Sequence, residues 1–202
     1  MTDSMDFFEK IEEHLLNDSK PSEYLNSIKD NPEFKKHPYD YLNKLIQTEQ
    51  SPKYHPEGSV WNHTMLVIDG AAKVKNKSKN KRAFMWAALL HDIGKPSTTR
   101  KRKGKITSYD HDKVGAELAE KFLLEVGQDE EFIKDVTALV RYHMQILFVL
   151  NNLPFADISS MKDHVDINEI ALLGYCDRMG RLNADSSKEQ KNIEEFIRKV
   201  TM

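Results

Sequence analysis

The 202-residue sequence predicts an all-helical protein. Apolar residues recur at helical spacing along most of the chain, whereas Pro and Gly number only 7 and 8. Hydrophobic residues make up 39% and charged residues 31%, which suits a globule with one sizeable core. Residues 106–109 are the only stretch that we predict to be a strand.

Composition also excludes several kinds of protein. The formal net charge is −2, so any contact with nucleic acid must come from a local patch. A single cysteine, Cys176, excludes a disulfide framework and a cysteine-rich zinc module. The start of the chain lacks the basic and apolar regions of a signal peptide, and no apolar stretch reaches membrane-spanning length. We therefore expect a cytoplasmic protein with no membrane contact.

Residues 1–50 predict a helical extension that packs as a lid or wall on the main core. Helices are expected over residues 6–17, 23–28 and 39–47, with prolines between them. No chemical motif occurs in this part, so we assign the functional domain to residues 51–202.

Residues 51–58 form a predicted loop, and Ser59 can cap a helix over residues 60–74. The apolar spacing of that helix turns His63 inward. A lone inward histidine is ordinarily a satisfied core residue, and a metal ligand is the alternative.

An apolar run over residues 87–90 ends abruptly in His91 and Asp92, with Gly94 and Pro96 as helix stop signals. Both side chains carry lone pairs and would lie at the carboxyl end of a buried helix. By itself the pair is either a polar cap or two ligands of a metal site.

The segment that follows, residues 95–105, is dense in positive charge and contains Gly104. It predicts a small hairpin or a flexible loop. Arg100–Lys105 would be either a phosphate-facing lip or an ordinary exposed hairpin tip.

Two further helices are expected to bring histidines inward. One opens at Asp110-His111-Asp112, with Asp110 or Asp112 as its cap, and stops at Gly127. Its predicted buried stripe consists of Val114, Leu118, Phe122 and Val126. The other spans residues 129–145 and places His143 on its apolar face.

Short helices follow over residues 158–164 and 187–200, and a longer apolar helix over residues 167–181 carries Asp177 on its inner face. A buried acid must be protonated or paired, and Arg181, four residues later, is a suitable partner. For contact with a substrate phosphate, Arg181 lies on the same face as Asp177, whereas Arg178 lies about 100° away around the helix and is the weaker choice.

Six side chains thus lie on or beside an inward helical face or a helix end: His63, His91, Asp92, His111, His143 and Asp177. Imidazole and carboxylate ligands without a thiolate suit a divalent ion of Fe, Mn, Ni, Mg or Zn rather than calcium. Six ligands are too many for a closed structural zinc site, but they suit two ions with open positions.

The order of these motifs resembles the HD superfamily of metal-dependent phosphohydrolases. More narrowly, residues 55–64, 91–96 and 177–181 are similar to the HD domain of bacterial tRNA nucleotidyltransferases. The resemblance covers about residues 50–185 and implies an HD-domain helical bundle. About 50 preceding residues cannot hold a nucleotidyltransferase head, so we expect a free-standing HD domain.

The resemblance also assigns roles. His63, His91, Asp92 and Asp177 match the four-ligand core of the family. His111 and His143 match the extra histidines of members with a second metal, in which the Asp of the pair bridges. Lys95 matches a lysine that meets a substrate phosphate.

We therefore predict a metal-dependent phosphohydrolase that acts on nucleotides or RNA ends, such as 2′,3′-cyclic phosphates, through a metal-activated water. Asp92 and Lys95 would be catalytic, and Lys95, Arg181 and Arg178 would bind the substrate. Arg100–Lys105 would add a weak nucleic-acid contact. The alternatives are a non-catalytic nucleotide- or RNA-binding module with a structural metal, or an accessory to a separate nucleotidyltransferase or kinase.

Overall fold

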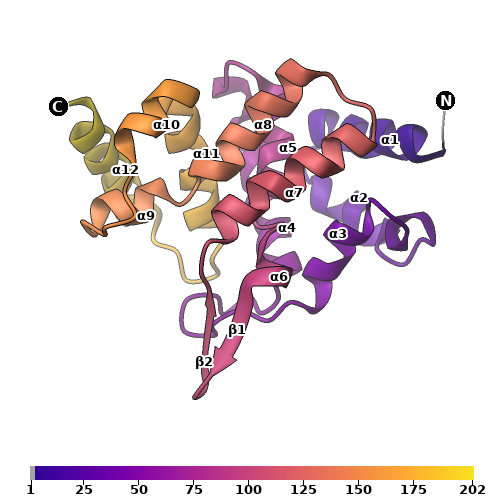
Figure 1. The fold of residues 1–202 in the computed structure, drawn as a ribbon, viewed down its shortest axis with the longest axis horizontal. Coiled ribbons are helices and arrows are strands. Elements are labelled where there is room, and N and C mark those ends of the chain that lie inside the picture. The colour runs from indigo at the N-terminus through magenta and orange to yellow at the C-terminus, as the bar shows by residue number, and fades with distance from the viewer. Residues whose placement is uncertain (1–2) are drawn as a thin grey trace.

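The computed structural model describes residues 3–202 and is built almost entirely of helices (Figure 1). The N-terminal part contains α1 (Asp3–Asn17), α2 (Pro21–Ile28), η1 (Glu33–Lys35), α3 (Asp40–Asn43) and η2 (Lys44–Gln47). The middle contains α4 (Val60–Val74), η3 (Lys75–Lys77), α5 (Lys81–Leu90), α6 (Lys95–Thr98), β1 (Thr99–Arg102), β2 (Lys105–Ser108), α7 (His111–Glu125) and α8 (Glu130–Tyr142). The C-terminal part contains α9 (Gln145–Leu150), α10 (Ile158–His164), α11 (Ile167–Met179) and α12 (Ser186–Thr201). The all-α prediction is confirmed.

Helix α5 lies at the centre of the molecule. Every residue from Ala83 to Leu90 is buried, because α1, α4, α8 and α11 all pack against this helix. A helix that is apolar on all sides is stable only when it is enclosed in this way. The C-terminal end of α5 therefore lies inside the protein, and the residues that follow it, His91 and Asp92, are buried.

The N-terminal helices pack directly on α5 and α4. Phe8 of α1 stacks on Trp86 with ring centroids 4.2 Å apart, and Glu12 accepts a hydrogen bond of 2.8 Å from the Trp86 indole. Buried side chains from both sides of residue 50 belong to one hydrophobic cluster. The division at that residue stays a prediction.

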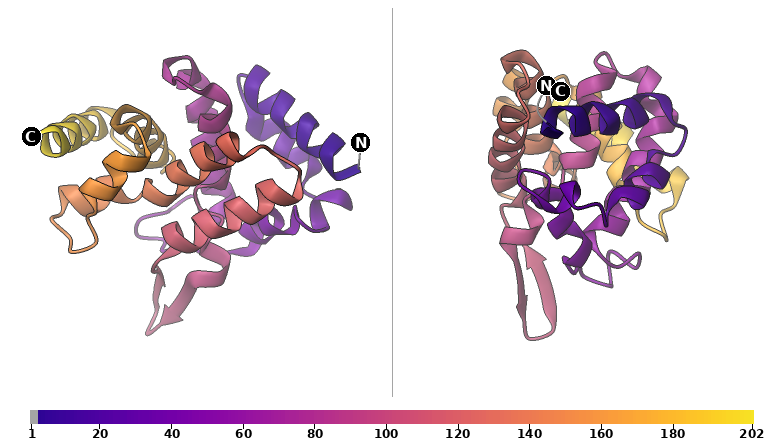
Figure 2. Two further views of the ribbon diagram at one scale, coloured as in Figure 1. Left: turned by 45° about the horizontal axis from the view of Figure 1, so that its top comes forward. Right: turned by 90° about the vertical axis from the view of Figure 1, so that its right-hand side faces the viewer.

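Helices α7 and α8 form a pair that covers one side of the bundle, as Figures 1 and 2 show. The buried face of α7 consists of Gly115, Ala119, Phe122 and Leu123, while Val114 and Leu118 are only half-buried. The predicted stripe is confirmed at Phe122 and Val126, which are buried, and it was wrong by one position at Val114 and Leu118. Small residues at 115 and 119 let this face approach its neighbours closely, and a stripe chosen by side-chain size misses them.

The basic segment forms a two-stranded antiparallel hairpin that projects from the helical body (Figure 1). Its turn residues, Lys103 and Gly104, have φ of 48° and 75°, which matches the right-handed twist of a tight hairpin. The prediction of a single strand at residues 106–109 was wrong in two respects: Thr99–Arg102 is its partner strand, and β2 ends at Ser108.

Several predicted helix ends also moved. Pro96 lies in the first turn of α6 instead of ending a helix, because proline is tolerated where no backbone N–H is needed. The helix predicted over residues 129–145 ends at Tyr142, and α9 then begins separately. Neither Asp110 nor Asp112 caps α7, because Asp110 adopts a left-handed φ of 58° and Asp112 pairs with Arg141 at 2.7 Å. Within residues 3–202, no helix has the length and hydrophobicity needed to span a bilayer.

Candidate metal centre

Six side chains predicted from scattered positions converge at the inner end of α5. His63 comes from α4, His91 and Asp92 follow α5, His111 begins α7, His143 follows α8, and Asp177 lies near the end of α11. Neighbouring imidazole rings in this group have centroids only 5.2–5.5 Å apart. All four histidines and Asp92 are buried.

Asp92 lies between two sets of imidazoles. Its Oδ2 is 3.2 Å from Nε2 of His91, whereas its Oδ1 is 3.4 Å from Nε2 of His111 and 3.8 Å from Nε2 of His143. Two groups with the spacing of metal ligands result, namely His63–His91–Asp92 and Asp92–His111–His143. The ligand atoms within each group lie within 4.8 Å of one another, and Asp92 is shared.

Asp177 completes the group on the side of His63. Its Oδ1 is 2.8 Å from Nε2 of His63 and 4.0 Å from Nε2 of His91. The Asp177 carboxylate is therefore paired with the imidazole of His63, and the predicted pairing with Arg181 was wrong. The reason is that α11 ends at Met179, so Arg181 does not lie one helical turn beyond Asp177.

The protonation of three histidines is fixed by backbone carbonyls. Nδ1 of His91, His111 and His143 donates to the carbonyl three residues earlier, at 2.8, 2.6 and 2.6 Å. A carbonyl only accepts hydrogen bonds, so Nδ1 carries the proton and Nε2 of each neutral ring presents a lone pair. Among the described residues, these three buried Nε2 atoms have no hydrogen-bond partner. Buried lone pairs aimed at one carboxylate suit a divalent cation.

His63 is oriented by Glu57, which the sequence reasoning missed. Nδ1 of His63 donates to Oε1 of Glu57 at 2.9 Å, and the same oxygen lies 2.8 Å from Nδ1 of His55. Carboxylates commonly hold ligating histidines in this way. Glu57 and His55 lie in residues 51–58. The Pro and Gly content of that segment predicts a loop and gives no sign of a role at the site.

Lys95 is buried beside Asp92 rather than exposed at the mouth of the site. Its Nζ is 2.7 Å from Oδ2 of Asp92 and donates to Oε1 of Gln50 at 2.7 Å. Gln50 is itself buried and donates to the carbonyl of Ser59 at 3.2 Å. Gln50 was also missed, because nothing in the local sequence distinguishes it from a surface glutamine.

The two arginines of the predicted site differ in their surroundings. Arg178 forms an ion pair with Glu189 of α12, so a carboxylate already occupies its guanidinium. Arg181 is half-buried, and its Nε has no hydrogen-bond partner among the described residues. Its positive charge helps to lower the pKa of Asp177.

Burial and charge act in opposite directions on the pKa values of the cluster. Burial opposes ionisation of Asp92, yet Lys95 and His91 hold its pKa well below the usual range. Burial lowers the pKa of His143 to about 4. For His63, burial is outweighed by Asp177 and Glu57, which raise the pKa to about 9.

Two glycines allow the backbone to approach the ligands. A Cβ atom at Gly94 would lie 2.2 Å from the carbonyl oxygen of His111 and 2.6 Å from the amide nitrogen of Gly115. A Cβ atom at Gly180 would lie 2.5 Å from Val67 Cγ2 and 3.2 Å from His63 Cε1. Neither contact is tolerable, so both positions require glycine.

Comparison with known proteins agrees with this geometry. Residues 60–149 match the HD domain family. The multifunctional CCA protein of Actinobacillus pleuropneumoniae serotype 5b (strain L20) is 34% identical over 105 residues, which are 50% of this chain and 24% of that protein. The A-adding tRNA nucleotidyltransferase of Deinococcus radiodurans is 41% identical over 61 residues, which are 29% of this chain and 14% of that protein.

The matched part of this chain thus spans about a quarter or less of the length of these relatives. The family match includes all five residues of the two ligand groups, namely His63, His91, Asp92, His111 and His143, whereas Asp177 lies beyond it. Residues 60–149 of this chain therefore match the HD domain family, and the chain is similar over part of its length to enzymes named as CCA proteins and tRNA nucleotidyltransferases.

Proposed function

We propose that the chain is a metal-dependent phosphohydrolase whose centre takes up to two divalent ions. The observation that carries the proposal is the position of Asp92, whose two oxygens face separate sets of histidines. The buried, unpartnered Nε2 atoms of His91, His111 and His143 support it, because such atoms are costly unless a ligand satisfies them.

His63, His91, Asp92 and Asp177 would hold one ion, and Asp92, His111 and His143 would hold the other. Divalent ions bound there would supply Lewis acidity, which lowers the pKa of water and offsets charge on phosphoryl oxygens. The native ion is Fe, Mn, Ni, Mg or Zn, since no thiolate is present in the cluster.

The remaining side chains would act on the substrate and on Asp92. Nζ of Lys95 donates a hydrogen bond to Gln50 and forms an ion pair with Asp92, and a remaining N–H donor would bind a phosphate oxygen. Arg181 has an unpartnered guanidinium nitrogen for the same purpose. Arg178 has a lesser role, because Glu189 competes for it.

The proposed substrate is a phosphoester of a nucleotide or of an RNA end. Support comes from the relative in Deinococcus radiodurans, which is named an A-adding tRNA nucleotidyltransferase. The reactions that fit are 2′,3′-cyclic phosphodiesterase, 2′-nucleotidase and phosphatase reactions. In each of them, water attacks phosphorus and an alkoxide oxygen leaves as an alcohol.

The test uses protein purified without chelator and assayed with bis-p-nitrophenyl phosphate and 2′,3′-cyclic AMP in each of the five metals. Asp92→Asn is compared with Asp163→Asn, which alters an exposed carboxylate without an ion pair among the described residues. Loss of turnover in Asp92→Asn alone supports the proposal. Metal binding without turnover in the unmodified protein would favour the non-catalytic binding module instead.

A further inference from the structure

The β1–β2 hairpin combines a high density of cations with a direct attachment to the candidate metal centre. Residues 100–105 hold five of the 30 Lys and Arg residues of the chain, and all of them are exposed. The carbonyl of Ser108, at the end of β2, accepts the 2.6 Å hydrogen bond from Nδ1 of His111. The hairpin is therefore anchored by a proposed metal ligand.

The two faces of the hairpin differ. Thr99 pairs with Ser108 and Lys101 pairs with Ile106, so these residues share one face. On that face the hydroxyls of Thr99 and Ser108 are 2.7 Å apart, and Lys101 lies 3.3 Å from Glu49. This face is therefore satisfied by the protein itself.

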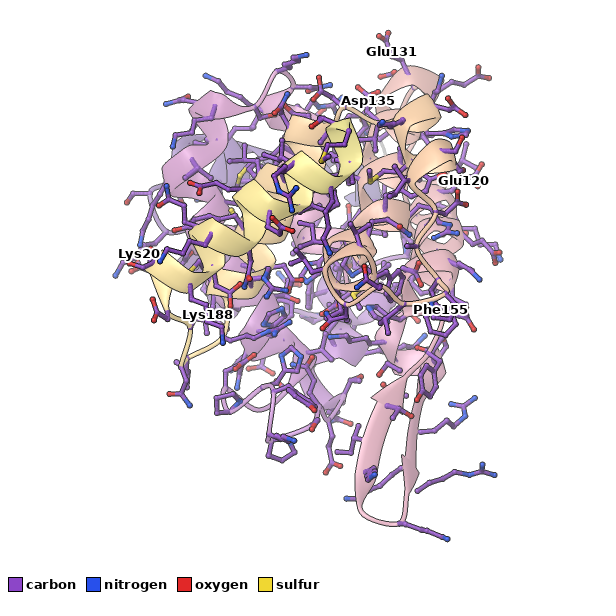
Figure 3. The ribbon with its side chains drawn as sticks, turned by 90° about the vertical axis from the view of Figure 1, so that its left-hand side faces the viewer. Lys20, Glu120, Glu131, Asp135, Phe155 and Lys188 are labelled. Carbon is purple, nitrogen blue, oxygen red and sulfur yellow. The ribbon has the colours of Figure 1, made fainter. Side chains whose placement is uncertain are left out.

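The opposite face carries Arg100, Arg102 and Lys105, together with Thr107. Lys103 lies in the turn beside them. Among the described residues, no carboxylate is within ion-pair distance of Arg102, Lys103 or Lys105. Figure 3 shows the hairpin standing clear of the helices, with side chains extending into open space. These charges do not stabilise the fold through pairing, so they are available to an anionic partner.

An exposed aromatic residue lies in the sequence between the basic hairpin and the proposed metal ligand His111. Tyr109 is 73% exposed, which is unusual for a large aromatic side chain. It comes directly after the last residue of β2, and it precedes His111 by two positions. The neighbouring carboxylate of Asp110 is occupied by Lys113 at 3.1 Å.

We propose that the hairpin and Tyr109 bind single-stranded nucleic acid and present its end to the metal centre. The phosphates would lie along Arg102, Lys103 and Lys105, and a base near the end would stack on Tyr109. Basic side chains that follow a backbone, next to an exposed aromatic ring, are the features of single-strand binding. The inference rests on the proposed function, because it names the kind of substrate that reaches the phosphohydrolase site.

The test measures binding apart from hydrolysis. Fluorescence anisotropy of a labelled 12-nucleotide single-stranded RNA is recorded in EDTA over a range of salt concentrations, with the same RNA annealed to its complement as a second probe. The Arg102/Lys103/Lys105 triple alanine variant is expected to lower the salt slope by about 2, since each lost phosphate contact removes about 0.7. A matched triple alanine variant at Lys121, Lys188 and Lys191, which are exposed cations on α7 and α12, should keep the original slope.

Stacking is tested separately at Tyr109. Tyr109→Ala is expected to weaken single-strand binding about 10-fold, whereas Tyr109→Phe keeps the ring and the affinity. The duplex should bind more weakly than the single strand. Equal binding of both probes, or no effect of Tyr109→Ala, would overturn the proposal.

Two further arms separate the possible failures. If the hairpin served a membrane, vesicles containing phosphatidylserine would bind in a hairpin-dependent manner and the RNA would not, which would also overturn the proposal. RNA binding in EDTA by a protein that hydrolyses no phosphoester would refute the proposed function while supporting the binding surface. Hydrolysis of bis-p-nitrophenyl phosphate without RNA binding would do the reverse.

Discussion

The ammonium of Lys95 lies 2.7 Å from Oδ2 of Asp92, and both side chains are almost entirely shielded from water. Lys95 therefore neutralises the carboxylate that lies between the two sets of histidines. Its second contact, the 2.7 Å hydrogen bond to Gln50, fixes the ammonium in that place. Charge balance at the centre thus depends on a residue that is not itself a metal ligand.

Lys95→Met is expected to destabilise the metal-free protein by about 3 kcal/mol, because it leaves the buried Asp92 carboxylate without its cation. With Mn²⁺ present the loss should be smaller, since a bound cation would offset the same charge. Urea unfolding with and without EDTA measures both values. An equal loss in the two conditions would contradict the proposed ion position.

The number of bound ions should depend on which ligand group is altered. His63→Ala and Asp177→Ala are expected to remove one of two Mn²⁺ ions, His143→Ala the other, and Asp92→Ala to weaken both. Metal content after equilibrium dialysis gives the count. His164→Ala, which alters an exposed histidine outside the cluster, is the control.

Glu57→Gln should lower turnover by about 10-fold to 100-fold, because partners that orient a ligating histidine usually have effects of that size. The 2.9 Å contact with Nδ1 of His63 loses its negative charge but keeps its length. Glu117→Gln, an exposed substitution on α7, should have no effect. Steady-state kinetics and Mn²⁺ affinity, measured together, distinguish misorientation of His63 from unfolding.

Metal binding at pH 7 should release about one proton from His63. The pKa of this imidazole is raised to about 9, so it is protonated in the metal-free protein, and a ligating Nε2 must lose that proton. His143, with a pKa lowered to about 4, is already neutral and releases none. Calorimetric titration with Mn²⁺ in buffers of different ionisation enthalpy counts the protons.

The same pKa has a consequence for stability. Because folding raises the pKa of His63, its contribution to the metal-free fold is fully present below the unfolded value of 6.5 and is lost as pH rises through about 9. His63→Gln should remove this part of the pH dependence of urea unfolding. An unchanged profile, or proton uptake in the calorimetric titration, would contradict the assignment.

Gly94→Ala should destabilise the protein by at least about 1–3 kcal/mol, because the added methyl would overlap the backbone at His111 and Gly115. Gly70→Ala is the matched control. No atom lies within 4 Å of its added Cβ in α4, and alanine favours a helix over glycine by about 1 kcal/mol. Thermal unfolding of the two variants should therefore shift in opposite directions.

Much of the architecture follows from local sequence. Helix α4 begins at Val60 because the side chain of Ser59 accepts a hydrogen bond from the backbone amide of Asn62, and this N-cap is evident in the sequence. The inward faces of His63, His143 and Asp177 follow from helical spacing alone. His91, Asp92 and His111 were found at predicted helix ends, and the order of the motifs gave the resemblance to the HD superfamily.

Tertiary contacts decided the surroundings of those side chains. Gln50 and Glu57 lie in irregular segments without periodicity, so only the tertiary hydrogen bonds reveal that Gln50 holds Lys95 and Glu57 holds His63. The same holds for β1, since the strand Thr99–Arg102 exists because Lys105–Ser108 pairs with it. Hydrogen bonds between distant segments leave no periodic pattern in either segment. The sequence by itself therefore determined which residues point inward. Only the tertiary structure determined which side chains, such as Gln50 and Glu57, hold Lys95 and His63 in place.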